Sequence, residues 1–505
     1  MAKYKSYDYA QRVMIPISLD DQLMPGTLEF AVHTLVETHM DTSIFDSHYH
    51  NDETGRTAYN PKVLLKIILF GYSRGLTTSR KLERACKENV IFMALACGQQ
   101  PDHSTIAAFV SSMISEILPL FRDVLMVCEE SSLLGGTFFA LDGCKIPSNA
   151  SKSMSGRFAD LSRNKENLEK KIKQLLKEQL DADQQDSKND NDKPSGTTNR
   201  EKQIERLQKK ADLIEEWLDE NEPKIGKKGR EVKSNVTDND SVLMLTSHGT
   251  IQGYNGQAFV DSKHQVIIHG EAFGTGQDHY LVPPMLDGAK ENVKAIGLGN
   301  DYFKEKTFAA DTNYNSPVNL KKCDEEKLDA YIPDKDFRTR DSRFDGRRRK
   351  SGRFILDDFK YNEETDTYTC PDGKTLKLQV KFFEVKNIFY RRYATDEENC
   401  SVCKLKTRCL TKGRARRRLM SVPVAYAIDN LTKRMAAKID SDEGRKIYPQ
   451  RLAVVEPVFA NITTHKRMDR FTLRGKVKVD IQWMLYCMVH NIGKIIKYCP
   501  EYGVA

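Results

Sequence analysis

Three carboxylates in this sequence stand at the ends of apolar runs or within them, where an acid can hold a metal ion. Asp142 follows TFFAL, Asp311 follows TFAA, and Glu456 lies inside the helical run VVEPVF. A carboxylate among valine and phenylalanine side chains costs free energy unless a metal ion or a partner charge compensates it. Two Mg²⁺ ions held by carboxylate oxygens can activate a nucleophile and stabilise a leaving oxygen in phosphoryl transfer. No local spacing rule links the three acids, so only the fold could bring them together.

Basic side chains cluster after Glu456 and in two other places. The residues after it are Lys466, Arg467, Arg470, Arg474 and Lys476, and the other clusters are Arg347, Arg348, Arg349 and Lys350, and Arg414, Arg416, Arg417 and Arg418. Solvated faces commonly carry such runs. Three of them on one chain nevertheless favour a phosphate-rich partner such as nucleic acid.

Four cysteines have the spacing of a metal site. Cys370 precedes the turn sequence PDG, and Cys400, Cys403 and Cys409 follow in NCSVCKLKTRC. A C-x2-C pair on a tight turn can place two thiolates on one Zn²⁺ ion, and four protein ligands would close its coordination shell, as in a structural site. The alternative is four free thiols in a small β-subdomain. Other cysteines, among them Cys86, Cys97, Cys128 and Cys487, stand in apolar helical runs and are expected in the core.

Four further aspartates compete for a place in the acidic site. Asp261 follows a predicted strand and precedes a turn, and Asp238 and Asp240 lie in the loop sequence VTDNDS. Asp278, in GQDHYLVPP, could cap a helix and is the strongest competitor of Asp311.

The elements around these residues follow from hydrophobic periodicity. Residues 1–130 are expected to be mainly helical, with Asp102 or Ser104 as a helix cap, and TTSRKLERACKENVIFMALA as one helix. Strands are predicted at TFFALDGCKI, SVLMLT, GYNGQAFVD, QVIIHGEAFG and KTFAADTNYN, and helices at YLVPPMLDGAKEN and DIQWMLYCMVHNIGKII. Residues 156–235 carry two highly charged helical patterns and are expected to form an inserted hairpin. The pattern of strands, insertion, strands, second insertion and helix predicts one α/β core interrupted twice.

Composition sets the broad class. The chain has 505 residues, which suggests two to four structural units, and a net charge of +8. No stretch approaches the roughly 20 apolar residues of a membrane span, and the N-terminus lacks the apolar region of a secretory signal. Eleven cysteines without such a signal indicate a reducing cytosol.

Several segments, taken in order, resemble the DDE transposases of bacterial insertion sequences. They are ALDG, GYNGQAFVDSKHQVI, AADTNYNS and YPQRLAVVEPVF followed by RFTLRG and HNIGKI. The subgroup resembled has a Tyr-x-x-Arg-…-Glu signature on its last catalytic helix and a cysteine-rich insertion. The N-terminal segment from NPKVLLKIILF to PDHSTIAAF resembles the helical domain that precedes the catalytic core in these enzymes.

The resemblance implies an α/β fold with a ribonuclease H-like core. Its expected parts are a helical DNA-binding domain (1–130), the core (131–155, 236–321 and 446–496), the charged hairpin (156–235) and the basic, zinc-binding, cysteine-rich insertion (322–445). Asp142, Asp311 and Glu456 would hold Mg²⁺ or Mn²⁺ as the catalytic acids. Tyr448, Arg451, Lys466, Arg470 and Arg474 would contact DNA. Where the subgroup often has lysine seven positions after the glutamate, this chain has Thr463.

The function implied is DNA transposition in the bacterial cytoplasm, on the nucleoid. The protein would bind the terminal inverted repeats of its element, cleave DNA and join the 3′-hydroxyl ends to target DNA, as a homo-oligomer. Two alternatives share the same residues. One is a catalytically silent DNA-binding descendant of a transposase, and the other is a metal-dependent nuclease without strand transfer.

Overall fold

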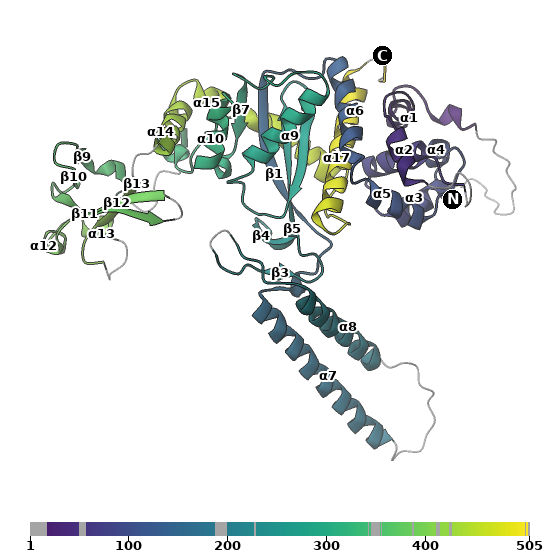
Figure 1. The fold of residues 1–505 in the computed structure, drawn as a ribbon, viewed down its shortest axis with the longest axis horizontal. Coiled ribbons are helices and arrows are strands. Elements are labelled where there is room, and N and C mark those ends of the chain that lie inside the picture. Colours follow the sequence, from purple (N-terminus) through teal and green to yellow (C-terminus); the bar gives the residue numbers. More distant parts are fainter. Residues whose placement is uncertain are drawn as a thin grey trace, which may run out of the picture.

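The computed structural model describes residues 18–49, 57–186, 199–226, 229–341, 343–344, 354, 356–385, 388–410, 415–423, 427–499 and 501–502. Figure 1 shows a central α/β body with N-terminal helices on one side, a small β-rich unit on the other and a long helical hairpin below. The basic residues Arg347 to Lys350 and Arg414 lie outside the described residues.

A mixed sheet of six strands forms the centre of the molecule. Its strands are β1 (Phe138–Pro147), β4 (Val242–Thr246), β5 (Gly249–Asp261), β6 (Ile267–Phe273), β7 (Thr307–Ala310) and β8 (Asp329–Tyr331). The order is β4-β5-β1-β7-β8, and β6 also pairs with β5. β1 is antiparallel to β5 and parallel to β7, and β7 is parallel to β8. The five predicted strands are confirmed, because each apolar run is long enough to cross the sheet.

Helices cover both faces of this sheet. α9 (Val282–Ala295) brings Gly288 against His269, whereas α17 (Lys476–Tyr498) brings Trp483 and Cys487 against Gly270. Adjacent strand residues point to opposite faces, so the two helices lie on opposite sides of the sheet. α16 (Gln450–Ala460) packs on β1 and β5 and continues into a π-helical turn, η7 (Asn461–His465).

The N-terminal region is mainly helical, as predicted, and its described residues form six α-helices. They are α1 (Leu28–Thr38), α2 (Pro61–Ser73), α3 (Ser79–Glu88), α4 (Val90–Leu95), α5 (His103–Ser112) and α6 (Ile117–Glu130). The Asp102 side chain caps α5 by accepting a hydrogen bond from the Thr105 amide at 2.8 Å. The prediction of one helix for residues 77–96 is wrong, because extended Asn89 ends α3 and caps α4 with its side chain.

These helices are not packed as a separate body. Buried residues of α1, α2, α5 and α6 belong to the same hydrophobic cluster as those of the sheet, and all four helices contact α17. In the part of the chain that the structure describes, no single helix has the length and apolar character to cross a membrane. α5 and α6 meet the test only as a pair bent by 81°.

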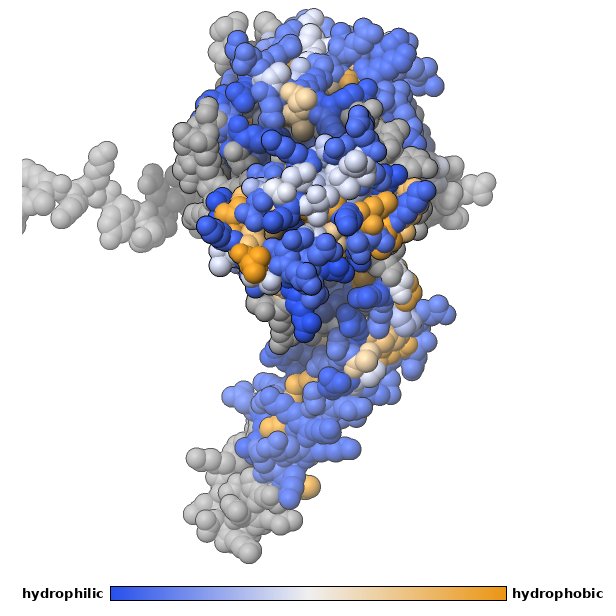
Figure 2. Space-filling view, turned by 90° about the vertical axis from the view of Figure 1, so that its left-hand side faces the viewer, coloured by the Kyte–Doolittle hydropathy of each residue, from blue (hydrophilic) through white to orange (hydrophobic). Residues whose placement is uncertain are grey.

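The charged hairpin is present as predicted. It consists of α7 (Phe158–Asp186) and α8 (Asn199–Glu220), and a short ladder of β2 (Ser155–Gly156) and β3 (Ser234–Asn235) lies at its base. Its own small core contains Met154, Leu161, Ile214 and Val236. Figure 2 shows the hairpin extending below a largely hydrophilic side of the molecule.

The cysteine-rich region contains a second sheet, where the sequence suggested a small β-subdomain without predicting its strands. Its antiparallel strands are β9 (Lys360–Asn362), β10 (Thr367–Thr369), β11 (Thr375–Val385), β12 (Ile388–Ala394) and β13 (Leu419–Pro423). The short helices beside it are α12 (Glu397–Ser401) and α13 (Lys406–Cys409). Between this unit and the central sheet lie α10 (Pro317–Glu325), α14 (Ala427–Asp440) and α15 (Gly444–Ile447). The short helix α11 (Phe337–Arg340) packs against α14.

Short 3₁₀ turns complete the described elements. They are η1 (Asp20–Gln22), η2 (Ser43–His48), η3 (Lys152–Met154), η4 (Thr312–Tyr314) and η6 (Leu356–Asp358).

Candidate active site

Two of the predicted acids lie side by side where β7 ends next to the middle of β1. Leu141 of β1 is paired in register with Ala310, the last residue of the parallel strand β7. Asp142 and Asp311 each follow these paired residues, which brings the two carboxylates to the same place. Both line an open cavity of about 670 Å³.

Asp278 is a third carboxylate in this cavity. Burial raises its pKa, although the amide groups of Asn255 (2.7 Å) and Gln257 (3.1 Å) donate hydrogen bonds that favour the charged form. Burial also raises the pKa of Asp311, and the neighbouring charge of Asp142 raises it further. A bound cation would stabilise the charged forms of carboxylates that are crowded together and have raised pKa values.

Arg451 supplies a positive charge to this cluster. Its Nη1 atom donates to Oδ2 of Asp142 at 2.6 Å, while Oδ1 of Asp142 accepts a hydrogen bond from the Gly143 amide at 2.8 Å. Arg451 is only 7% exposed, and its Nε atom has no partner among the described atoms. The signature arginine, expected to contact DNA, therefore contacts the first acid in this structure.

Glu456 does not join the two aspartates. It is exposed on α16, and the expectation that it lies buried among valines and phenylalanine is wrong. The buried residues of α16 are Arg451, Val454, Val455 and Val458. Since each helical residue turns by about 100°, Glu456 lies roughly 140° around the helix axis from Arg451. It is not among the residues that line the cavity of Asp142 and Asp311.

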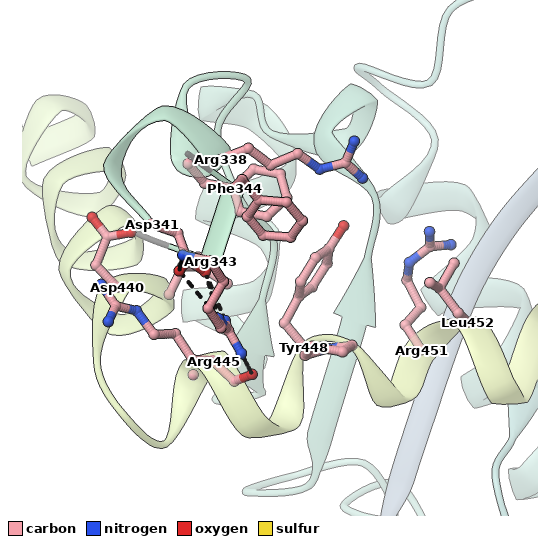
Figure 3. A pocket seen from close by; sticks show the side chains of 13 residues that line it. Arg338, Asp341, Arg343, Phe344, Asp440, Arg445, Tyr448, Arg451 and Leu452 are labelled. Atoms are coloured by element: carbon pink, nitrogen blue, oxygen red, sulfur yellow. Dashed lines mark hydrogen bonds and ion pairs between the residues drawn. The ribbon is translucent and has the colours of Figure 1, made fainter. Parts of the chain in front are cut away.

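Tyr448 and Arg451 share a second cavity, of about 190 Å³, with aromatic and basic side chains. Tyr448 packs edge-to-face against Phe337 at 5.4 Å, and the Arg338 guanidinium lies over the rings of Phe337 (5.4 Å) and Phe344 (5.6 Å). Figure 3 shows the Tyr448 ring between Phe344 and Arg338 on one side and Arg451 on the other. Burial raises the pKa of Tyr448, so its hydroxyl stays a hydrogen-bond donor at neutral pH. The aromatic side chains of this cavity can stack on a planar ring, and its arginines can bind a phosphate.

The other predicted DNA contacts lie farther along the chain. Lys466 is half-buried directly after η7, and Arg470 is exposed in the loop that follows. The Arg474 guanidinium donates two hydrogen bonds to the Asn149 carbonyl, at 3.1 and 3.0 Å, and so fastens this loop to the chain after β1. The Thr463 hydroxyl donates a hydrogen bond to the Phe459 carbonyl at 2.8 Å, so this side chain contacts the preceding helical turn.

Three of the competing aspartates have structural roles. Asp261 is fully buried and accepts hydrogen bonds from the amides of Gly135, Gly136 and Lys263. In the loop before β4, Asp238 and Asp240 accept the amides of Gly475 (3.3 Å) and Lys476 (2.9 Å) and so cap α17.

The four predicted zinc ligands lie together. Cys370, Cys400, Cys403 and Cys409 line one small cavity beside the second sheet. The Lys374 amide donates to the Cys370 sulfur and the Leu405 amide to the Cys403 sulfur, both at 3.3 Å. Gly373 has φ +77° within the PDG turn, a conformation that glycine adopts without strain.

Sequence reasoning missed the polar residues that support these sites. Asn255 and Gln257 alternate on buried β5 and bind Asp278. The sequence did contain a signal for them: the two amide side chains in GYNGQAF are two positions apart, and this spacing places both on the same face of a strand. Arg338 and Phe344 gave no such signal, because they lie more than 100 residues before Tyr448.

No group of three or more His, Cys, Asp or Glu side chains in the described residues is arranged to hold a metal ion as it stands.

Two family models match the chain. One, described as "Transposase DDE domain", matches residues 369–496, and the other, described as "Transposase domain (DUF772)", matches residues 17–112. Comparisons with curated proteins and with solved structures gave no match.

Proposed function

Since this chain belongs to the DDE transposases of insertion elements, we propose that it cuts DNA at the ends of its element and joins them to a target. The observation that carries the proposal is the pair Asp142 and Asp311 on adjacent parallel strands, with Arg451 held against Asp142. The strand order, three antiparallel strands followed by two parallel ones, supports a ribonuclease H-like core.

The donor set fits hard divalent cations. Asp142 and Asp311 would hold Mg²⁺ or Mn²⁺ with Glu456 as a further ligand, and the ions would polarise the attacking water and the leaving oxygen. Glu456 is exposed on the helix that carries Arg451, so we propose that it reaches the site when DNA and metal are bound. Asp278 is the alternative third ligand, since it already lines the cavity.

The chain's own residues would then position the DNA end. In the cut, an oxygen of water bonds to phosphorus, the bond from phosphorus to the 3′-oxygen breaks, and that oxygen leaves as a 3′-hydroxyl. In the joining step, this hydroxyl attacks a target phosphorus and displaces another 3′-oxygen. Arg451 would move from Asp142 to a phosphate, and the cavity around Tyr448, Phe344 and Arg338 would hold the terminal nucleotide.

Zn²⁺ would bind Cys370, Cys400, Cys403 and Cys409 and stabilise the small β-rich unit. Burial raises the pKa of the Cys403 thiol, and the Leu405 amide, which donates to its sulfur, partly offsets this effect, so a Zn²⁺ ion would supply the remaining stabilisation of a thiolate. We expect protein purified without chelator to contain one Zn²⁺ per chain, Cys403→Ser to lose it and Cys97→Ser to keep it. The expectation that Cys97 lies in the core is wrong, because it is exposed just after α4, whereas Cys86, Cys128 and Cys487 are buried. Metal analysis that finds no zinc in the unaltered protein would refute this part.

The decisive experiment uses a supercoiled plasmid that carries both ends of the element, with Mg²⁺. We expect nicked and joined products with the unaltered protein, and none with Asp142→Asn or Asp311→Asn. Glu456→Gln and Asp278→Asn decide the third ligand, since only the true ligand should abolish cutting. Asp240→Asn, in the cap of α17, is the matched control. Binding without cutting by the unaltered protein would favour the silent descendant, and cutting without joining would favour the nuclease.

A further inference from the structure

One face of α8 carries exposed side chains that the hairpin does not use for its own packing. The buried residues of this helix are Ala211 and Ile214, and Ile214 shares a small core with Leu161 of α7. On the other side of the helix, exposed residues recur at alternating steps of four and three positions, which is the spacing of a coiled-coil seam. From the tip of the hairpin to its base they are Lys202, Arg206, Lys209, Leu213, Glu216 and Glu220. We call this set the outer stripe of α8. The hairpin projects away from the central body (Figure 1).

Most charges of the outer stripe are unpaired in the described part of the chain. Those that form neither a side-chain hydrogen bond nor an ion pair there are Lys202, Arg206, Glu216 and Glu220. Charges beside the stripe are used within the hairpin, since Glu215 pairs with Lys165 of α7. Lys209 pairs with Glu205 of its own helix at 2.6 Å. The stripe therefore has unpaired positive charges in its tip half and unpaired negative charges in its base half.

This order of charges makes the outer stripe complementary to a second copy of itself. When two α8 helices run antiparallel and cross at Ala211, residues equally far before and after this position face each other. Arg206 then faces Glu216 of the second copy, and Lys202 faces Glu220. Leu213, which is 41% exposed, lies beside the alkyl chain of Lys209. Every contact occurs twice, because a two-fold axis relates the copies.

Other pairings of the same stripe match less well. In a parallel pair each charge meets its own copy, so Arg206 would face Arg206. An antiparallel pair shifted by seven residues in one direction brings Arg206 opposite Lys209. A shift in the other direction leaves Lys209 opposite Glu220 as the one pair of opposite charges within the stripe. Like charges placed opposite each other select against a partner or a register. The stripe therefore favours the antiparallel pair that crosses at Ala211.

We propose that the outer stripe of α8 is a surface through which two copies of this chain associate, antiparallel and centred on Ala211. Exposed ion pairs add little affinity, and α8 is only about 33 Å long at the helical rise, so the dimer is weak. Two chains held on the two ends of one element would be concentrated enough to pair. That setting rests on the proposed function, whereas the pairing itself needs neither DNA nor metal.

Reversal of the charges tests the pairing. Sedimentation equilibrium of the full chain at low ionic strength, where exposed charges are least screened, measures the dissociation constant of the dimer. Arg206→Glu should weaken the dimer about tenfold, because two attractions become two repulsions in the symmetric pair. Arg206→Glu/Glu216→Arg should restore the affinity, because both partners are then reversed together. An affinity that the single change leaves unaltered, or that the double change does not restore, would overturn the proposal.

A matched control tests the register. Lys202→Glu/Glu216→Lys also exchanges one basic and one acidic residue of the stripe, but these two positions do not face each other. Each reversed residue would then meet a like charge, so this variant should associate more weakly than Arg206→Glu. All of these positions are exposed, and the melting temperatures should equal that of the unaltered chain. Restored affinity in this control would overturn the register centred on Ala211.

A complex with DNA separates this surface from the proposed catalysis. Light scattering counts the chains on a plasmid fragment that carries both ends of the element. We expect two chains that resist dilution for the unaltered protein and for Arg206→Glu/Glu216→Arg, and easier loss of one chain for Arg206→Glu. Charge-dependent pairing without cutting of the plasmid would refute the catalysis and leave the surface standing. Cutting by a chain that is monomeric both alone and on DNA would overturn the surface and leave the catalysis standing.

Discussion

At the scale of single residues, the ion pair of Arg451 with Asp142 dominates the site. Arg451 has a side chain that is 8% exposed and Asp142 one that is 23% exposed, so water screens their attraction only partly. A metal ion and Arg451 compete for the same carboxylate. The sequence predicted Arg451 as a functional residue but not this partner, because the two positions are 309 residues apart and nothing local links them.

Arg451→Met should therefore unfold more easily and bind metal more readily. We expect a loss of about 3 kcal/mol in the free energy of unfolding without metal, since removal of one partner leaves a partly buried charge. Mn²⁺ should restore part of this loss, and its binding can be followed by electron paramagnetic resonance in the absence of DNA. Arg434→Met, which removes an exposed pair with Asp324, should cost less than 1 kcal/mol. Equal urea midpoints for the two variants would contradict this account.

Two half-buried lysines, Lys466 after η7 and Lys494 near the end of α17, predict a dependence of stability on pH. The pKa values of Lys466 and Lys494 are lowered to about 8 from 10.5 by burial, so between these values the folded state binds fewer protons than the unfolded state. The stability contributed by these groups therefore rises as the pH rises from about 8 to 10.5. Lys466→Met/Lys494→Met should be more stable than the unaltered protein at pH 7, and the difference should shrink by pH 10. The charged neighbours of these lysines are Lys263 and Lys497. Burial lowers the pKa values of the nearby His264 and His490, so these histidines titrate below this pH range. Chemical denaturation at both pH values tests the prediction, and a difference that is constant with pH would contradict it.

At the scale of elements, α16 shows why Glu456 could not be placed from sequence. The run LAVVEPVF looks apolar throughout, yet the helix buries only the face of Arg451, Val454, Val455 and Val458. Pro457 inside this helix has no amide hydrogen and cannot bond the Ala453 carbonyl. The side chain of Gln265, from the turn after β5, donates to that carbonyl at 3.0 Å.

This replacement bond predicts coupling between two distant positions. Gln265→Leu should cost about 1 to 2 kcal/mol, because the Ala453 carbonyl loses its partner. In a Pro457→Ala background the new amide can bond the carbonyl, so the same change should cost less. A double-mutant cycle by urea denaturation compares the cost of Gln265→Leu in the two backgrounds. Equal costs would show that Gln265 stabilises the fold through another contact, for example the hydrogen bond that it accepts from Lys494.

Elements were predictable where one apolar run decides burial. β5 and β7 are such runs and are buried over most of their length, whereas β1 is buried mainly from Phe139 to Leu141. The strands of the second sheet were not predicted individually: β9 is wholly exposed, and the alternation of polar and apolar residues in TLKLQVK of β11, which is typical of a strand, was overlooked. Its core of Phe359, Leu376, Tyr393 and Met420 is assembled from four segments, which no local pattern shows.

At the scale of the whole molecule, the charged hairpin is attached by a narrow base. Gly156 and Ser234 are paired across β2 and β3, so a short connection can replace everything between them. We expect a chain with residues 158–231 replaced by a Gly-Ser linker to keep the melting temperature of its core within about 3 °C. If the hairpin serves assembly, light scattering of the complex with DNA should show fewer protomers than for the unaltered chain. A large fall in melting temperature would show that the hairpin is part of the core.

The packing of the N-terminal helices on α17 has a consequence for the order in which the protein is made. Four of the six helices nearest the start of the chain contact its last long helix, and the Tyr502 hydroxyl lies 2.7 Å from the His39 ring. A ribosome releases the first helices hundreds of residues before α17 exists, so their apolar faces stay uncovered throughout most of synthesis. Products that stop before residue 476 would never complete this region. Only a chain translated through α17 would therefore have fully packed N-terminal helices.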